Sequence, residues 1–300
     1  MQDNLIIPLK NKTMKKILLC TDGSTFSQSS YQYVSWLAPR LNAATDVLYV
    51  TDIRSQKVAS MGNWSGSIGF DTANDLLEQI VELEHQKAKL NQQRAQLILQ
   101  AAQKCLASQG VGDVKTIHET GFLVDSFHKF EAQADLIVLG KRGEHAQFAT
   151  KHLGSNTERI IRASHKPCLI TPLNYQPIER ILLAYDDSKS CQKVLQFLVS
   201  SPAFKDLELH LLTVAKKEDD PKAIEYLNSG REKLEKAGLN PICYVLQGDP
   251  EIVISNYIKS HSISLLVMGA YGHSRIRSLI IGGTTVQMLR STHIPVLLYR

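Results

Sequence analysis

The sequence predicts an α/β protein made of two tandem, doubly wound, five-stranded parallel-sheet domains. The length of 300 residues suits two domains rather than one. Short segments of the first half recur in the second half in the same order. In each half, short and almost wholly apolar runs alternate with helical patterns. Apolar runs of this kind are typical of parallel strands that helices cover on both faces.

The repeat consists of four pairs of matching segments. They are 17–24 with 181–188, 135–143 with 264–272, 153–162 with 281–290, and 164–171 with 292–299. Each unit is long enough to bury its own core, which indicates a duplicated domain and not a solenoid. We therefore expect an N-terminal tail over 1–14, a first domain over 15–172, a short proline-bounded linker, and a second domain over 178–300.

The second half illustrates the expected elements most clearly. Helices are expected over 190–199, 222–237 and 251–260. Strands are expected over 180–185, 208–214, 242–246, 265–269 and 296–299. Each half ends in a proline followed by a short apolar strand, and a strand at the edge of a sheet needs a partner. We expect the two final strands to pair with each other, forming an intramolecular pseudo-twofold dimer, and the sequence leaves a further homodimer open.

The first half differs by an inserted segment that has no counterpart in the second. A Gly/Ser-rich loop over 61–69 precedes a helical pattern from Ala73 to Ser108. Leucines recur there every seven residues, at Leu76, Leu83, Leu90 and Leu97, which is a coiled-coil spacing. Because Lys87 and Arg94 interrupt that seam, an amphipathic helix lying on its own sheet is the preferred interpretation.

Composition and charge exclude several classes of protein. The chain is 43% hydrophobic and 21% charged, as in ordinary globular proteins, and its net charge of +5 is too mild to argue for nucleic acid. No apolar run approaches the ~20 residues that span a bilayer, and no signal peptide is recognisable. Five scattered cysteines without a CxxC pair fit a reducing compartment, so we expect a cytoplasmic protein.

Candidate binding residues follow the strands, because ligands of doubly wound sheets lie beyond the carboxyl ends of the strands. Three segments of each half meet this condition. They contribute Asp22, Val50, Gly140, Gly143, Gly154 and Ser155 in the first half, and Asp186, Val214, Gly269, Gly272, Gly282, Gly283, Thr284 and Thr285 in the second.

The glycine segments suit a phosphate. Glycines allow backbone N–H groups to approach an anion, and a helical pattern follows each segment, so that its helix N-terminus would favour negative charge. Hydroxyls of Ser155, Thr157, Thr284 and Thr285 are further donors. A carboxylate at Asp22 or Asp186 suits a ribose hydroxyl or an adenine amino group, both of which donate hydrogen bonds.

This combination resembles the universal stress protein family, and the duplication resembles its tandem members. The family's nucleotide-binding members carry Gly-x2-Gly-x9-Gly-(Ser/Thr). Here Gly269-x2-Gly272 is followed after nine residues by Gly282, with Gly283 in place of the hydroxyl residue. In the first half, Gly140-x2-Gly143 is followed after ten residues by Gly154-Ser155. Each half therefore departs once from the pattern.

The resemblance implies a HUP-like adenine nucleotide-binding fold and a stress-response function. By this analogy the chain binds ATP, or AMP or ADP, possibly with Mg²⁺ carried by the nucleotide, and has little or no turnover. Asp22 and Asp186 correspond to the family's adenosine-contacting aspartate, and Val50 and Val214 to its adenine-facing valine. The second-half site matches the family's loop length better than the first.

Two other functions stay open. One is a weak ATPase or nucleotidyl-type enzyme, although the sequence has no Walker A motif, no GxSxG elbow and no catalytic set. The other is an interaction protein that binds an apolar ligand or none, with the long helix and the Trp64 loop as its docking surface. No tight histidine pair indicates a resident metal.

Overall fold

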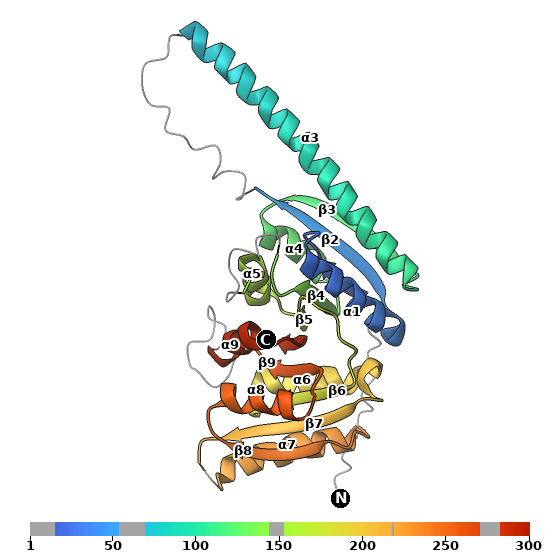
Figure 1. The fold of residues 1–300 in the computed structure, drawn as a ribbon, viewed down its shortest axis with the longest axis vertical. Coiled ribbons are helices and arrows are strands. Elements are labelled where there is room, and N and C mark those ends of the chain that lie inside the picture. The colour runs from blue at the N-terminus through green and yellow to red at the C-terminus, as the bar shows by residue number, and fades with distance from the viewer. Residues whose placement is uncertain (1–15, 54–69, 144–152, 218, 271–282) are drawn as a thin grey trace, which may run out of the picture.

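The protein is described from a computed structural model, in which residues 16–53, 70–143, 153–217, 219–270 and 283–300 are placed (Figure 1). The first half runs β1 (Lys16–Cys20), α1 (Thr25–Leu41), β2 (Ala44–Asp52), α3 (Phe70–Ser108), β3 (Val114–Gly121), α4 (Leu123–Glu131), β4 (Leu136–Gly140), α5 (Ser155–Ala163) and β5 (Cys168–Thr171).

The second half repeats this order. It runs β6 (Arg180–Ala184), α6 (Lys189–Ser200), the 3₁₀ turn η2 (Pro202–Phe204), β7 (Glu208–Ala215), α7 (Pro221–Lys236), β8 (Ile242–Gln247), α8 (Pro250–Ser260), β9 (Leu265–Gly269), α9 (Gly283–Ser291) and β10 (Val296–Tyr299). The expected alternation of strands and helices is thus confirmed. None of the described helices has the length and hydropathy needed to cross a membrane.

All the strands belong to one sheet, in the order β3-β2-β1-β4-β5-β10-β9-β6-β7-β8. Neighbouring strands are parallel within each half, and the single antiparallel pair of the described sheet is β5 with β10 at its centre. Leu169 lies opposite Leu297 in that pair. The expected pairing of the two final strands is confirmed, and each half thereby covers the other half's exposed edge.

Two hydrophobic cores cover the two faces of this sheet. Helices α1, α3, α6 and α7 pack on one face, and α4, α5, α8 and α9 pack on the other (Figure 1). Strand β1 serves both cores, since Ile17 and Leu19 face the first and Leu18 the second, all at most 1% exposed. Burial on both faces explains why the strands lack alternating polar residues.

Each half also places a cationic side chain at the C-terminal end of a helix in the other half. Lys141, which follows β4, donates from Nζ to the carbonyl oxygens of Arg290 (3.2 Å) and Thr292 (2.7 Å) at the end of α9. Arg300 donates in turn to the carbonyl oxygen of Arg162, near the end of α5, at 2.7 Å. Carbonyls at a helix C-terminus have no partner inside the helix and carry partial negative charge, so both contacts stabilise the assembly of the halves.

The long helix α3 departs from expectation. Its C-terminal part packs on β2 and β3 through Ala95, Leu99, Ala102 and Leu106, which are buried. Its N-terminal part extends beyond the sheet (Figure 1). A helix of 39 residues is ~58 Å long, whereas the nine residues of β2 span only ~30 Å. The expectation that this helix lies along its own sheet is therefore wrong for its N-terminal part.

Candidate functional site

The predicted contacts of the first half lie at one edge of the sheet. Cys20, near the end of β1, is level with Leu48 of β2 and Leu139 of β4. One or two residues further along these strands come the predicted contacts Asp22, Val50 and Gly140. Strands β2 and β4 flank β1 on opposite sides, so this edge is the switch point at which ligands of doubly wound sheets bind.

The second half has the same register. Ala184 of β6 is level with Leu212 of β7 and Met268 of β9, and Asp186, Val214 and Gly269 follow at the same offsets. Val50 and Val214 are both half-buried and pack against the second core. The duplication seen in the sequence therefore extends to the arrangement of the candidate residues.

In the first half, Asp22 and the glycine segment lie in direct contact. A Cβ added at Gly143 would collide with Oδ2 of Asp22, so the backbone there approaches the carboxylate as closely as only a glycine allows. The other carboxylate oxygen, Oδ1, accepts hydrogen bonds from the amide of Ser24 (3.0 Å) and the hydroxyl of Ser27 (2.8 Å). These bonds fix the orientation of the Asp22 side chain.

The N-terminus of α5 adjoins the same segment. The amide of Gly154 donates to the carbonyl of Lys141 at 3.1 Å, and the hydroxyl of Thr157 donates to the carbonyl of Gly140 at 2.9 Å. Gly154 is the N-cap residue and makes no side-chain cap, while Ser155 is exposed. The first turn of α5 thus keeps amides that a phosphate can accept from.

In the second half, a different set of contacts stabilises the turn after β6. Oδ1 of Asp186 accepts from the amide of Ser188 at 3.0 Å, as Asp22 does from Ser24. Asp187 points elsewhere and accepts from Tyr185 (2.6 Å) and Lys233 (3.4 Å). Burial alone would raise the pKa of Asp187, but the hydrogen bonds from Tyr185 and Gln192 and the charge of Lys233 lower it. The two adjacent carboxylates therefore have separate partners.

The glycine segment of the second half is described in part. Gly269 is buried against Ser190 and Cys191, and Gly283 and Thr284 are exposed in the first turn of α9. The hydroxyl of Thr285 is buried and donates to the carbonyls of Gly269 or Ala270, at 3.4 and 3.3 Å. Thr285 therefore ties α9 to the end of β9, as Thr157 ties α5 to β4. Gly272 and Gly282 lie outside the described residues, as does Trp64.

Two polar groups near the first-half site have open hydrogen-bonding capacity among the described residues. Oγ of Ser24 and Nη2 of Arg159 are both buried without a partner there. Arg159 lies in α5 and pairs through Nη1 with Asp52, at the end of β2, at 3.1 Å. Arg159 could not be recognised from the sequence as a site residue, because only the fold brings residues 52 and 159 together.

Lys141 directly follows Gly140, but its side chain reaches into the other half, so it does not screen a phosphate at the glycine segment. Its ammonium is buried between the halves, and burial, together with the neighbouring Arg142, lowers its pKa to about 8. Its charge thus acts at the end of α9.

One cluster of potential metal ligands occurs within the described residues, formed by His128, Glu131 and His165. Oε1 of the buried Glu131 accepts from the Ser164 hydroxyl (2.7 Å) and the His165 amide (2.5 Å), and Oε2 contacts Nδ1 of His128 at 2.9 Å. Burial alone would raise the pKa of Glu131, but these hydrogen bonds lower it. The carboxylate thereby joins α4 to the turn before β5. This turn lies at the opposite edge of the sheet from the glycine segment, which follows the carboxyl end of β4.

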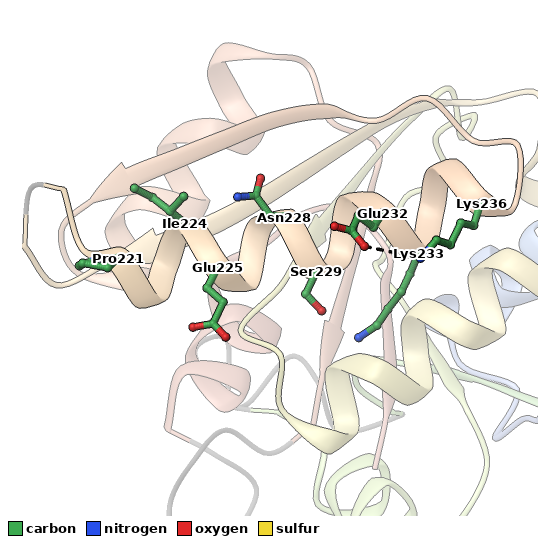
Figure 2. A pocket seen from close by; sticks show the side chains of 8 residues that line it. All are labelled: Pro221, Ile224, Glu225, Asn228, Ser229, Glu232, Lys233 and Lys236. Carbon is green, nitrogen blue, oxygen red and sulfur yellow. Dashed lines mark ion pairs between the residues drawn. The ribbon is translucent and has the colours of Figure 1, made fainter. Parts of the chain in front are cut away.

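A groove of ≈ 570 Å³ runs along α7 (Figure 2). Its walls come from one helix, and its charged side chains include the Glu232–Lys236 pair at 3.5 Å. Among its lining residues, Lys233 reaches the turn after β6 through Tyr185, at 3.2 Å. The groove lies along the outside of the helix and does not include the strand ends, so it is separate from the candidate site.

Fold and site together define a tandem α/β protein in which two doubly wound units share one sheet. Comparison with known proteins identifies the family. The model of the universal stress protein family matches residues 13–172 and again residues 177–300. The chain belongs to the universal stress protein family, with two such domains in tandem.

Relatives and solved structures agree with this assignment. The chain is 53% identical to universal stress protein Slr1230 from Synechocystis, over 96% of this chain and 100% of that protein. A universal stress protein structure from Archaeoglobus fulgidus matches with a TM-score of 0.66 at 21% identity, covering 95% of this chain and 98% of the other. A putative universal stress protein from Pseudomonas aeruginosa matches with a TM-score of 0.62 at 13% identity, covering 96% and 94%. The predicted family and fold are thus confirmed.

Proposed function

We propose that this protein binds ATP or another adenine nucleotide at the carboxyl ends of its strands, and that it acts in the stress response as a regulatory protein with little or no turnover. The observation that carries the proposal is the contact between the Asp22 carboxylate and the glycine segment at Gly143, beside the uncapped N-terminus of α5. A carboxylate for the sugar or base and free amides for the phosphates then lie within one site.

The half-buried Val50 supports the assignment of the adenine end, since an apolar side chain beside the carboxylate suits a flat base. The buried Nη2 of Arg159 supports the phosphate end, because a guanidinium binds phosphate oxygens well. The shared register of Asp186, Val214 and Gly269 supports a second site of the same kind. Any Mg²⁺ would enter with the nucleotide's phosphates.

Calorimetry with ATP tests the proposal, because it reports both affinity and stoichiometry. We expect two equivalents of nucleotide per chain in the wild type. Asp22→Ala and Asp186→Ala should each weaken one site by about 10-fold or more, because each removes a charged hydrogen-bond acceptor. Asp206→Ala, a change at an exposed position away from both sites, is the matched control. No uptake by the wild type at millimolar ATP would refute nucleotide binding.

Turnover needs a separate measurement. Release of labelled phosphate from ATP should stay near background in the wild type and in Asp186→Ala alike. A rate that depends on Asp186 would favour the alternative of a weak ATPase. Mass spectrometry of small molecules released from the purified, denatured protein would identify the nucleotide that the protein carries.

An interaction function is the second candidate, and one observation favours it. Helix α3 exposes large apolar side chains where it projects beyond the sheet, and exposed apolar patches mark sites of association. This surface is distinct from the strand ends, so the two functions are compatible.

A further inference from the structure

A stripe of apolar side chains runs along α3, from its projecting part into the part that packs on the sheet. Ile80 is 46% exposed, Leu83 63%, Leu90 65% and Leu97 68%. With Lys87 and Arg94 between them, these residues follow each other at alternating intervals of three and four, which is the seam of a coiled coil. We call these six residues, Ile80, Leu83, Lys87, Leu90, Arg94 and Leu97, the α3 stripe.

The α3 stripe is separate from the face by which the helix packs on its own domain. Ala95 and Leu99, which flank Leu97 in the sequence, are 0% and 7% exposed and contact the core. A partner can therefore occupy the stripe without disturbing the fold. A helix that projects alone gains little stability in water, since most helical stability comes from packing of an apolar face.

The charges of α3 are completely segregated along its length. From residue 70 to 84 its charged residues are all acidic, and from 85 to 108 its lysines and arginines occur without any acid. The acids are Asp71, Asp75, Glu78, Glu82 and Glu84, and the bases are Lys87, Lys89, Arg94 and Lys104. This order suits the helix dipole, and it also makes the helix complementary to a copy of itself running in the opposite direction.

We propose that the α3 stripe binds the α3 stripe of a second copy of this chain in an antiparallel coiled coil, giving a homodimer. In a parallel pair, Lys87 would face Lys87 and Arg94 would face Arg94 of the partner within the seam, and acids would face acids. In an antiparallel pair centred near residue 85, Lys87 faces Leu83 of the partner subunit, which Glu82 and Glu84 flank, and Arg94 lies opposite the partner's acidic segment. An antiparallel pair is related by a twofold axis, so the assembly closes as a dimer.

Sedimentation velocity of the full chain at about 100 µM tests the proposal, a concentration about 100-fold above a micromolar Kd. We expect a dimer for the wild type. Leu83→Glu/Leu90→Glu should weaken it by about 1,000-fold or more, giving a largely monomeric chain, because the two substitutions place four charged side chains in the seam of the dimer. Ile252→Glu, at a position 62% exposed on α8, is the matched control and should stay dimeric. A monomeric wild type, or a leucine variant that remains a dimer, overturns the proposal.

Circular dichroism and the thermal midpoint of each variant establish that the α/β core is folded, which is expected because both leucines are exposed. Salt and charge then test the orientation. Antiparallel pairing brings opposite charges together, so raising NaCl from about 0.05 M to 0.5 M should weaken the dimer. Glu82→Lys/Glu84→Lys should weaken it as well, and adding Lys87→Glu/Lys89→Glu to the same chain should restore it. The antiparallel arrangement would be overturned if added NaCl strengthened the dimer and Glu82→Lys/Glu84→Lys left its stability unchanged.

Discussion

The turns after β1 and β6 have the same backbone shape and different neighbours. Gly23 has φ of 77° and Asp187, at the matching position, has φ of 54°, so both lie in the left-handed region. In the first half, a Cβ at Gly23 would lie 2.7 Å from Cγ1 of Ile98, on α3. In the second half, the matching residue is Asp187, and its carboxylate accepts hydrogen bonds from Tyr185 and Lys233. Aspartate tolerates the left-handed region better than most residues.

This difference shows that a duplicated unit can keep the geometry of a binding turn while replacing what supports it. An apolar contact from the inserted helix supports the turn of the first half, and a partly exposed polar network supports that of the second. The first-half site is therefore coupled to α3, whereas the second-half site is coupled to α7.

The largest expected effect is a difference in the free energy of unfolding between substitutions in the two glycine segments. Gly269→Val places a side chain against Ser190 Oγ (2.5 Å from a Cβ) and the backbone nitrogen of Cys191 (2.9 Å), so it should lower the free energy of unfolding by about 3 kcal/mol. Gly143→Ala instead meets only the Asp22 carboxylate, and displacing it costs the hydrogen bonds that orient it, so this change should weaken nucleotide binding at the first site with little loss of stability. Chemical denaturation and calorimetry on both variants give the comparison. Equal stability of the two variants would contradict it.

Removing the apolar support of the first turn should have the next largest effect. Ile98→Ala should lower the free energy of unfolding by about 2 kcal/mol, through lost packing against Gly23 and the core. It should also weaken the binding of ATP at the first site only, so that calorimetry detects one equivalent of ATP bound with wild-type affinity. Tyr185→Phe is the counterpart in the second half, since it removes the 2.6 Å bond to Asp187, and it should spare the first site. If either variant affected both sites equally, the two turns would not be independent.

Breaking one of the two cation contacts between the halves should have a smaller effect. Lys141→Met leaves the carbonyls at the end of α9 without their partner and should cost about 1–2 kcal/mol. Because the folded pKa is about 8 and lies below the ordinary value of 10.5, the folded state releases this proton first. The wild type should therefore gain stability relative to Lys141→Met as pH rises from about 8 to 10.5. Urea denaturation of both proteins at pH 7.5 and 10 measures this difference, and no change in it would contradict the assignment.

The smallest effect concerns Glu131 in the first half. Its folded pKa lies below the ordinary value of 4.5, so its ionised form stabilises the fold, and this contribution is complete above about pH 4.5. It is lost as the pH falls through the folded pKa. The wild type should exceed Glu131→Gln by about 1 kcal/mol at pH 7 and converge with it in more acidic buffer. A difference that grew on acidification would reverse the expected sign.

Much of the fold could be predicted because it depends on local patterns. The expected strands 265–269 and 296–299 coincide with β9 and β10, and the other strands of the second half are within a residue. The approach of Asp22 to Gly143 followed from the rule that strand ends converge. Arg159 could not be found in this way, because its partner Asp52 is more than 100 residues away in the chain. The expectation for α3 was wrong because helical periodicity carries no information on how far a sheet extends.

The sequence by itself determined the duplication, the order of strands and helices, and the positions of glycines and carboxylates at strand ends, because apolar periodicity and turn residues act over short distances. Only the tertiary structure decided which side chains serve the site and which serve the fold. Lys141 is near the glycine segment in sequence, yet its side chain donates to a carbonyl at the end of the other half's last helix. Leu83, Leu90 and Leu97 of α3 look like core residues in sequence and are exposed, since whether an apolar face is covered depends on what the rest of the chain places against it.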